Sequence, residues 1–188
     1  MQAFLVSTGV VAIAEIGDKT QLLTLLLTLR FGRPVPIILA ILLATLANHG
    51  IAAWLGVLAA DWLSSDLFGW FLGLSFIAMG VWTLKPDVLE DAERERITGT
   101  SAFLVTLVSF FLVEIGDKTQ LATVALAARF DTVFWVAAGT TLGMMLANVP
   151  VVLLGEAAAS RLPLKAIRIC AAIIFIGLGT ATLLSLIF

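Results

Sequence analysis

Two copies of one octapeptide place charged side chains inside apolar stretches of this chain. The sequence EIGDKTQL runs from Glu15 to Leu22 and recurs unchanged from Glu114 to Leu121. Each copy supplies two carboxylates, one ammonium group and several neutral oxygens. Carboxylates and neutral oxygens form the hard coordination that Ca²⁺, Mg²⁺ and Mn²⁺ prefer. The repeated motif therefore predicts a binding site for a divalent cation of that kind.

The predicted metal ligands are the four carboxylates of Glu15, Asp18, Glu114 and Asp117. Two lysines and six neutral side chains are candidates for additional ligands or for a proton pathway: Lys19, Thr20, Gln21, Asn48, Lys118, Thr119, Gln120 and Asn148. The chain has one His, one Cys and four Met, so ligands that favour Zn²⁺ or Cu⁺ are scarce. The expected ion is Mn²⁺ or Ca²⁺, between which oxygen ligands do not decide, and no cofactor is expected.

Polar residues outside the octapeptide have more than one interpretation. A Leu-Ala-Asn segment ending at Asn48 matches one ending at Asn148 after a one-residue slip in the repeat. The two asparagines either ligate the ion or only hydrogen-bond neighbouring helices, a common role in membranes. His49 is a candidate proton relay, but the repeat has Val149 in its place, or Asn148 if the slip is not made. The sequence leaves its role open.

Composition places the chain in a membrane. Of its 188 residues, 61% are hydrophobic and 13% are charged, and its mean hydropathy is +1.10, whereas soluble domains carry about a quarter of their residues as charges. Continuous apolar runs, each long enough to cross a hydrocarbon core of about 30 Å, span residues 4–29, 35–60, 67–84, 101–128, 132–155 and 164–188. They lack the alternation of a β-barrel. The sequence predicts an all-α, polytopic protein with six transmembrane helices.

The six predicted helices divide into two copies of a three-helix unit. At an offset of 99 residues the octapeptides coincide and Phe76 meets Phe175. The predicted organisation is a first repeat over 1–85, a linker over 86–99 with seven charges in fourteen residues, and a second repeat over 100–188. Units with an odd number of spans enter the membrane from opposite sides. The repeats are therefore expected to be inverted and to form one transmembrane domain, as in many transporters.

Lysine and arginine residues predict the orientation, because positively charged loops stay in the cytoplasm. Eight of them fall on the side of the central linker, and only Arg129 falls in a loop on the other side. The linker is therefore placed in the cytoplasm and both termini outside, with Trp62, Trp70 and Trp135 near the outer interface. The net charge of −2 argues against a nucleic-acid partner. The expected partners are divalent cations, protons and lipid, and a homodimer is left open.

The octapeptides are expected near the middle of the first and fourth helices, close to the bilayer midplane. A charge at that depth costs at least about 2.5–3.5 kcal/mol, so the charged groups need mutual partners. In a continuous helix Glu15 and Asp18 share one face, and Glu15 and Lys19 form an ion pair along it. Gly17 and Gly116 remove a side chain just before each aspartate and let a backbone or an ion approach closely.

The charges of the two copies can be counted as one site. Two Glu and two Asp against two Lys leave two negative charges, which one divalent cation or two protons would neutralise. A site that crosses the membrane only in neutral states would exchange one cation for two protons by alternating access. A passive divalent-cation channel is the alternative, and cation flux that ignores a pH gradient would favour it.

Intramembrane aspartyl proteases also carry a Gly-Asp motif, in the form Gly-x-Gly-Asp, and pair two aspartates from different helices. In this chain Glu15 and Glu114 stand at the first glycine position. The lysine after each aspartate would hold both carboxylates ionised, whereas an aspartyl dyad needs one of them protonated. A transporter is therefore expected rather than an enzyme.

With two copies of Glu-x-Gly-Asp-Lys-Thr in the first helices of two three-helix units, the chain resembles the GDT family, which includes transmembrane protein 165 of the Golgi and small bacterial manganese exporters. The resemblance covers essentially all 188 residues. It implies a secondary active transporter that exports Mn²⁺ or Ca²⁺ from the cytosol in exchange for protons, carried by Glu15, Asp18, Glu114 and Asp117. The short chain, without an additional leading segment, is similar to the bacterial members of the inner (plasma) membrane.

Overall fold

The computed structural model describes residues 1–62, 65–86, 99–155 and 163–187. Within these ranges the chain forms eight helices: α1 (Gln2–Glu15), α2 (Lys19–Phe31), α3 (Pro34–Trp62), α4 (Ser65–Thr83), α6 (Ala102–Glu114), α7 (Lys118–Phe130), α8 (Val133–Leu154) and α10 (Leu164–Ile187). No strand occurs among the described residues, so the all-α prediction is confirmed. Residues 87–98 of the predicted linker and the side chain of Trp62 lie outside the description.

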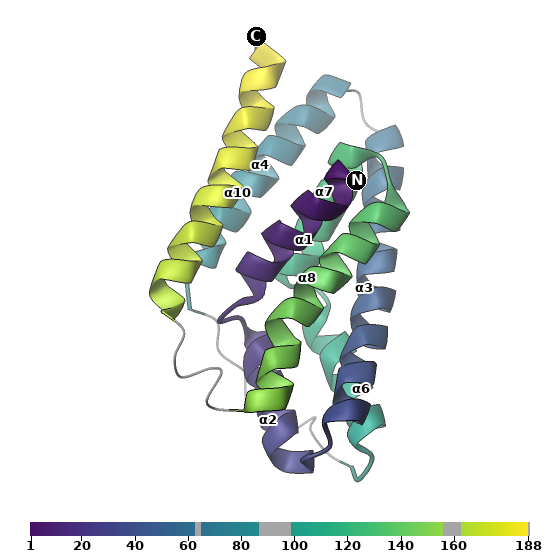
Figure 1. Cartoon of the computed structure of the whole chain (residues 1–188). Helices are drawn as coiled ribbons and strands as arrows, with labels where there is room; N and C mark the ends of the chain where they lie inside the picture. Colours follow the sequence, from purple (N-terminus) through teal and green to yellow (C-terminus); the bar gives the residue numbers. More distant parts are fainter. Residues whose placement is uncertain (63–64, 87–98, 156–162, 188) are drawn as a thin grey trace.

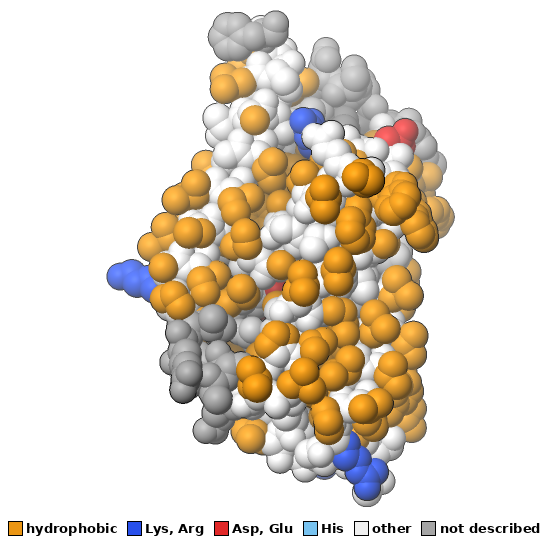
Figure 2. Space-filling model, viewed as in Figure 1, with side chains coloured by type: hydrophobic (Ala, Val, Ile, Leu, Met, Phe, Trp, Pro, Cys, Tyr) orange, Lys and Arg blue, Asp and Glu red, His pale blue; other side chains and the backbone are white. Residues whose placement is uncertain are grey.

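Three of the described helices are long and apolar enough to cross a membrane: Pro34–Ala60 within α3, Val133–Leu154 (α8) and Leu164–Ile187 (α10). Large apolar side chains are exposed along them, for example Leu39 and Leu43 of α3 and Leu146 and Leu153 of α8. Figure 2 shows hydrophobic side chains over most of the visible face, with Lys and Arg side chains at its edges. So large an exposed apolar surface suits a lipid environment, as expected of an integral membrane protein.

Neither octapeptide lies in a continuous helix. The predicted run 4–29 is divided between α1, which ends at Glu15, and α2, which begins at Lys19. The run 101–128 is divided in the same way between α6, which ends at Glu114, and α7, which begins at Lys118. The prediction of one unbroken helix through each motif is therefore wrong, and the octapeptide is the point at which each helix stops and restarts.

Glycine and aspartate explain the break. Gly17 and Gly116 adopt φ values of +83° and +78°, a left-handed conformation that costs a glycine little and other residues more. Asp18 and Asp117 then act as N-caps of the following helices, accepting hydrogen bonds from the backbone N–H of Lys19 (2.7 Å) and of Thr119 (3.1 Å). Each half-helix therefore ends and begins with local partners for its backbone.

The break also overturns the predicted side-chain geometry within each copy. Glu15 is the last residue of one helix and Asp18 caps the next, so the two carboxylates do not share a helix face. Lys19 is likewise not one turn from Glu15 along a common helix, and the predicted i, i+4 ion pair loses its basis.

The first helices of each half pack against the long helix of the other half. Figure 1 shows α1 alongside α8 near the centre of the molecule, and α3 contacts both α6 and α7. Glycines make the approach close: a Cβ added at Gly139 or Gly143 of α8 would lie 2.5 or 2.7 Å from the carbonyl oxygens of Phe4 and Thr8 in α1. Small residues at such crossings allow helices in membranes to pack tightly, and here they hold the two halves together.

The last described helices of the two halves, α4 and α10, run side by side along one flank (Figure 1). The rings of Phe76 and Phe175 stack with centroids 6.4 Å apart, and a Cβ on Gly179 would lie 2.5 Å from the carbonyl oxygen of Gly73. Phe76 and Phe175 are equivalent positions of the repeat. Contact between equivalent residues is what a pseudo-twofold relation between the halves produces.

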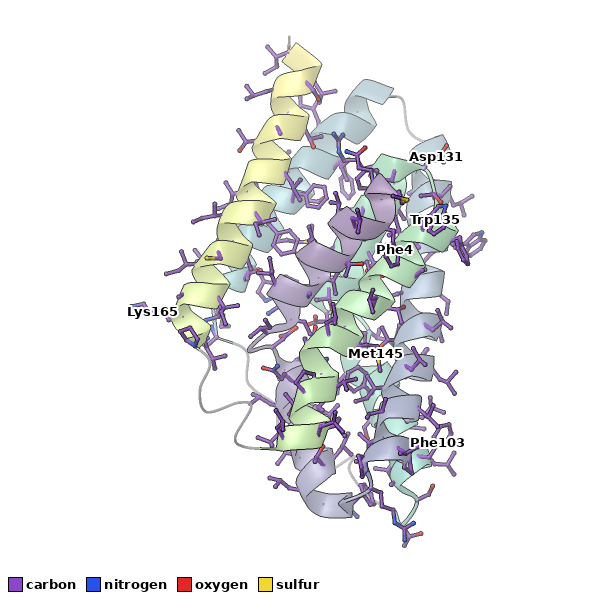
Figure 3. All side chains as sticks on the ribbon, viewed as in Figure 1. Phe4, Phe103, Asp131, Trp135, Met145 and Lys165 are labelled. Atoms are coloured by element: carbon purple, nitrogen blue, oxygen red, sulfur yellow. The ribbon has the colours of Figure 1, made fainter. Side chains whose placement is uncertain are left out.

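The connections gather at two ends. Arg30 Nη2 donates a hydrogen bond to the Gly99 carbonyl oxygen at 3.0 Å, which joins the end of α2 to the start of the second half. Asp131 and Trp135 lie toward the other end, where Trp135 packs edge-on against Phe4 with ring centroids 6.3 Å apart (Figure 3). The two loops that follow α2 and α7 therefore sit at opposite ends of the molecule.

Candidate functional site

Glu15 closes α1 inside the protein, with 0% of its surface exposed. Its Oε1 accepts hydrogen bonds from the hydroxyl of Thr20, at the start of α2, and from Asn148 Nδ2 of α8 at 3.1 Å. Asn148 Oδ1 in turn accepts from the Thr24 hydroxyl at 2.7 Å. One carboxylate oxygen is therefore held by the restarted helix and by the opposite half. These residues form the first half-site.

Glu114 closes α6 in the same manner and is also 0% exposed. Its Oε1 accepts a hydrogen bond from the Thr119 hydroxyl at 2.6 Å and lies 3.2 Å from His49 Nε2 of α3. The Thr119 hydroxyl is also 3.1 Å from Asp117 Oδ2. These residues form the second half-site, in which an imidazole stands where the first has an amide.

The lysines connect the two motifs to each other. Lys118 Nζ lies 3.0 Å from Asp18 Oδ1, and both side chains are almost fully buried. Lys19 Nζ lies 3.8 Å from Asp117 Oδ1, with 20% of the lysine side chain exposed. We call these contacts the crossed ion pairs, because each joins the lysine of one octapeptide to the aspartate of the other. They replace the predicted pairing of Glu15 with Lys19.

The glutamines of the octapeptides support the helix breaks. Gln21 Oε1 and Gln120 Oε1 accept hydrogen bonds from the N–H groups of Gly17 (2.9 Å) and Gly116 (2.8 Å). Their amide nitrogens donate to the opposite half, from Gln21 to the Ala147 carbonyl oxygen and from Gln120 to Asn48 Oδ1, both at 3.1 Å. The two residues of each Thr-Gln pair, whose roles the sequence left open, therefore have different roles. The threonine binds the glutamate, and the glutamine binds the backbone of the loop between the two helices.

The hydrogen bonds of the Asn48 side chain join it to a backbone carbonyl group and to a glutamine rather than to a glutamate. Its Nδ2 donates to the Phe111 carbonyl oxygen of α6 at 2.9 Å, and its Oδ1 accepts from Gln120. Asn148, by contrast, bonds Glu15 directly. The two asparagines that a one-residue slip made equivalent therefore have different surroundings, and the slip is wrong.

A constant offset of 99 pairs His49 with Asn148 and Asn48 with Ala147. Both pairs occupy matching places: His49 and Asn148 contact a glutamate, while Asn48 and Ala147 accept from a glutamine. The sequence analysis had left the role of His49 open. A constant offset of 99 between the two repeats is the signal in the sequence that places His49 in the site.

Each glutamate uses only one of its two carboxylate oxygens in the hydrogen bonds described above. Glu15 Oε2 and Glu114 Oε2 are buried, and neither has a hydrogen-bond partner among the described residues. An unpaired carboxylate oxygen in the interior is costly and is available to a cation or a proton. Within the described ranges, no three acidic, His or Cys side chains come together as a group that could hold a metal ion.

The comparisons with known proteins cover both halves of the chain. The family model described as "Divalent cation/proton antiporter GDT1" matches residues 3–91 and 102–187. A protein of Vibrio cholerae serotype O1, named "Putative manganese exporter", is 52% identical over 183 residues, which is 97% of this chain and 90% of that protein.

More distant relatives come from plants. GDT1-like protein 3 of Oryza sativa subsp. japonica is 24% identical over 206 residues, which cover 96% of this chain and 73% of the rice protein. GDT1-like protein 5 of Arabidopsis thaliana is 24% identical over 222 residues, which cover 98% of this chain and 96% of the plant protein. No solved structure matches the chain.

Proposed function

We propose, from the premise that the chain belongs to the GDT1 family of divalent cation/proton antiporters, that it exports Mn²⁺ from the cytosol in exchange for protons. Family membership makes it a transporter rather than an enzyme. The observation that carries the proposal is the pair of fully buried glutamates, Glu15 and Glu114, each with an unpartnered carboxylate oxygen at the end of a broken helix. The printed name of the Vibrio cholerae relative favours Mn²⁺ over Ca²⁺ as the cargo.

The proposed architecture is six membrane spans in two inverted repeats. The helix pairs α1–α2 and α6–α7 would each form one broken span, and α3, α4, α8 and α10 the other four. The equivalent positions that contact each other, Phe76 and Phe175, support this arrangement, as does the packing of each broken span on the long helix of the other half. Broken spans at the midplane are a recurrent device of transporters with inverted repeats.

The proposed orientation follows the basic residues. The end that holds Arg30 and Gly99 would face the cytoplasm of a bacterial inner membrane, and the end that holds Asp131 would face outside, together with both termini.

The crossed ion pairs sharpen the charge count behind the exchange. In each pair a lysine compensates an aspartate, Lys118 with Asp18 and Lys19 with Asp117. The two remaining negative charges then reside on Glu15 and Glu114. One divalent cation bridging the glutamates would neutralise both, and so would two protons, one on each. Exchange of one cation for two protons would therefore be electroneutral.

Alternating access would change the distance between the glutamates. In the present conformation both are fully buried and each is held by its own threonine. Because each glutamate is bonded to a helix of the opposite half, through Asn148 or His49, a movement of one half against the other would change these contacts and the separation of the two glutamates. Small shifts at packed helix interfaces are the usual means of such transitions.

The test is Mn²⁺ flux in proteoliposomes with and without an imposed pH gradient. The parent protein is expected to move Mn²⁺ against its gradient when protons flow the other way, and without a membrane current. Glu15→Gln and Glu114→Gln should each abolish this coupling, because a neutral amide neither balances the cation nor carries the proton.

Asp131→Asn is the matched control, since it is the same acid-to-amide change at an exposed residue far from the site, and it should transport normally. Mn²⁺ flux that persists unchanged when the pH gradient is removed would favour the channel instead. Transport of Ca²⁺ in the same vesicles would show whether the exchange extends to that ion.

A further inference from the structure

The two half-sites each hold a glutamate with a threonine, but they differ in the side chain that the opposite half supplies. In the first, Glu15 is held by Thr20 and by the amide of Asn148. In the second, Glu114 is held by Thr119 and approached by the imidazole of His49. His49 and Asn148 are equivalent positions of the repeat, so the difference between them breaks the symmetry of the centre.

In the first half-site, both the oxygen and the nitrogen of the Asn148 amide have hydrogen-bond partners. Asn148 Oδ1 accepts from Thr24, while Asn148 Nδ2 is near Glu15 Oε1 and the Met144 carbonyl oxygen, each at 3.1 Å. Holding a glutamate therefore requires no more than an asparagine. The imidazole of His49 at the equivalent place can also bind a metal ion through a ring nitrogen, which holding the glutamate does not require.

His49 is buried completely, and its Nδ1 has no hydrogen-bond partner among the described residues. Beside it, Glu114 Oε2 is also buried and without a partner in the described part of the chain. Buried polar atoms of this kind call for a specific explanation. A metal ion bound to Nε2 would leave the ring proton on Nδ1, and the same ion could also take Glu114 Oε2.

The distance between the two groups suits a metal ion. His49 Nε2 and Glu114 Oε1 are 3.2 Å apart. Two neighbouring ligands at a right angle on a divalent ion, with bonds of about 2.2 Å, are separated by about 3.1 Å. Both atoms could therefore bind one ion with little movement of either side chain.

We infer that His49 is a direct nitrogen ligand of the transported cation at the Glu114 half-site, and that this ligand makes the transporter select first-row transition-metal ions over Ca²⁺ and Mg²⁺. The inference rests on the proposed function, because it assigns a ligand and a substrate class to the same site. Ca²⁺ and Mg²⁺ bind through oxygen, whereas imidazole nitrogen binds transition metals well. The centre is then a mixed nitrogen and oxygen site and not the all-oxygen site expected from the sequence.

Selection among the transition metals would follow their general order of affinity. Divalent ions bind nitrogen and oxygen sites more tightly from Mn²⁺ through Fe²⁺ and Co²⁺. A site with one imidazole is therefore expected to accept Fe²⁺ and Co²⁺ at least as well as Mn²⁺. It would reject Ca²⁺ even where the carboxylates alone would bind it.

The decisive measurement is pulsed electron paramagnetic resonance of Mn²⁺ bound to the purified parent protein, carrying an affinity tag without histidine. His49 is the single histidine of the chain, so any imidazole ¹⁴N coupling to the bound Mn²⁺ comes from this residue. The expected spectrum shows that coupling, and growth on ¹⁵N-histidine should replace it by a ¹⁵N signal. This readout needs no variant, so it stands even if a substitution prevents folding.

The second measurement compares His49→Asn, which copies Asn148, with the parent and with the control Asp131→Asn. The ratio of Mn²⁺ to Ca²⁺ affinity is expected to fall by about tenfold or more in His49→Asn, since loss of even a hydrogen-bond partner of a metal ligand typically costs about that much affinity. Co²⁺ binding should fall with it, and Ca²⁺ exchange for protons should rise above that of the parent. Asp131→Asn should keep the parent ratio.

The outcomes separate the inference from the proposed function. Mn²⁺/proton exchange by the parent, without ¹⁴N coupling and with an unchanged affinity ratio in His49→Asn, would overturn the inference and leave the function in place. A parent protein that neither binds nor transports Mn²⁺ would overturn both.

Discussion

At the scale of single residues, the site separates two tasks that the octapeptide combines in sequence. Aspartates and lysines neutralise each other across the centre, as Lys118 Nζ and Asp18 Oδ1 do at 3.0 Å. The glutamates accept from threonine hydroxyls through one oxygen only, and their other oxygen has no hydrogen-bond partner among the described residues. Because buried ion pairs are costly to form and costlier to break, the aspartates and lysines suit a permanent structural role.

Lys118→Gln should therefore destabilise the protein strongly, since it leaves the buried Asp18 carboxylate without this counter-charge. Loss of one partner of a buried pair costs about 3–5 kcal/mol. Lys19→Gln should cost less, because its contact is longer, 3.8 Å against 3.0 Å, and its side chain is partly exposed. Thermal unfolding in detergent would measure both.

The double variant Lys118→Gln with Asp18→Asn provides the control for that prediction. Removal of both charges should recover much of the lost thermal stability. A double variant that is less stable than Lys118→Gln alone would show that the pair is not the source of the effect.

At the scale of the helices, the two breaks, between α1 and α2 and between α6 and α7, depend on two glycines with positive φ. Gly17 at +83° and Gly116 at +78° turn the chain so that the next residue, an aspartate, can cap a new helix. The end of one half-helix and the start of the next then meet at the site, which is how Glu114 and Thr119, five residues apart, come within 2.6 Å. A continuous helix would place them on different faces.

Gly116→Ala tests this backbone requirement with few side-chain complications. An added Cβ would meet nothing within 4 Å, so the expected loss of about 1–2 kcal/mol reflects the left-handed conformation alone. Gly17→Ala should cost more, because its Cβ would lie 3.0 Å from Leu164 Cδ2. Thermal unfolding and Mn²⁺ transport of both variants are the measurements.

Gly9→Ala is the matched control for these variants. Gly9 lies inside α1, and an added Cβ there also meets nothing within 4 Å. Since alanine is the better helix former, the control should be unchanged or more stable by about 0.5–1 kcal/mol. Equal losses at Gly9 and Gly116 would contradict a special role for the break.

Part of this element structure follows from the sequence and part of it does not. The repeat, the all-α class and the meeting of the two octapeptides follow from hydropathy and from the offset of 99. The breaks were missed because apolar residues continue through both motifs, although Gly-Asp ahead of a lysine and threonine is a helix-start signal. The crossed ion pairs could not be predicted, because they depend on how helices far apart in the sequence pack. No local sequence pattern indicates that Lys118 pairs with Asp18.

At the scale of the whole molecule, the two connections that follow α2 and α7 lie at opposite ends, one near Arg30 and Gly99 and the other near Asp131 and Trp135 (Figure 3). Inverted repeats require such a separation, because equivalent loops of the two copies face opposite sides of the membrane. The single cysteine, Cys170, is exposed in α10, and its replacement by serine would give a background for labelling.

In that background, single cysteines at Arg33 and Thr100 should react with a membrane-impermeant maleimide only from the cytoplasmic side, and a cysteine at Asp131 only from outside. All three positions are exposed. Labelling of intact cells and of inverted vesicles would compare the two sides. Reaction of Arg33 and Asp131 cysteines from the same side would exclude the inverted arrangement.

The crossed ion pairs have a consequence for assembly. Each half of the chain carries two buried acids and one buried or partly buried lysine, and the neutralising partner of each aspartate belongs to the other half. One half alone in the bilayer would therefore keep an aspartate and a lysine without the oppositely charged partners that the other half supplies. If the two halves were produced as separate chains, they should be retained only when made together, since each supplies the counter-charge that its counterpart lacks.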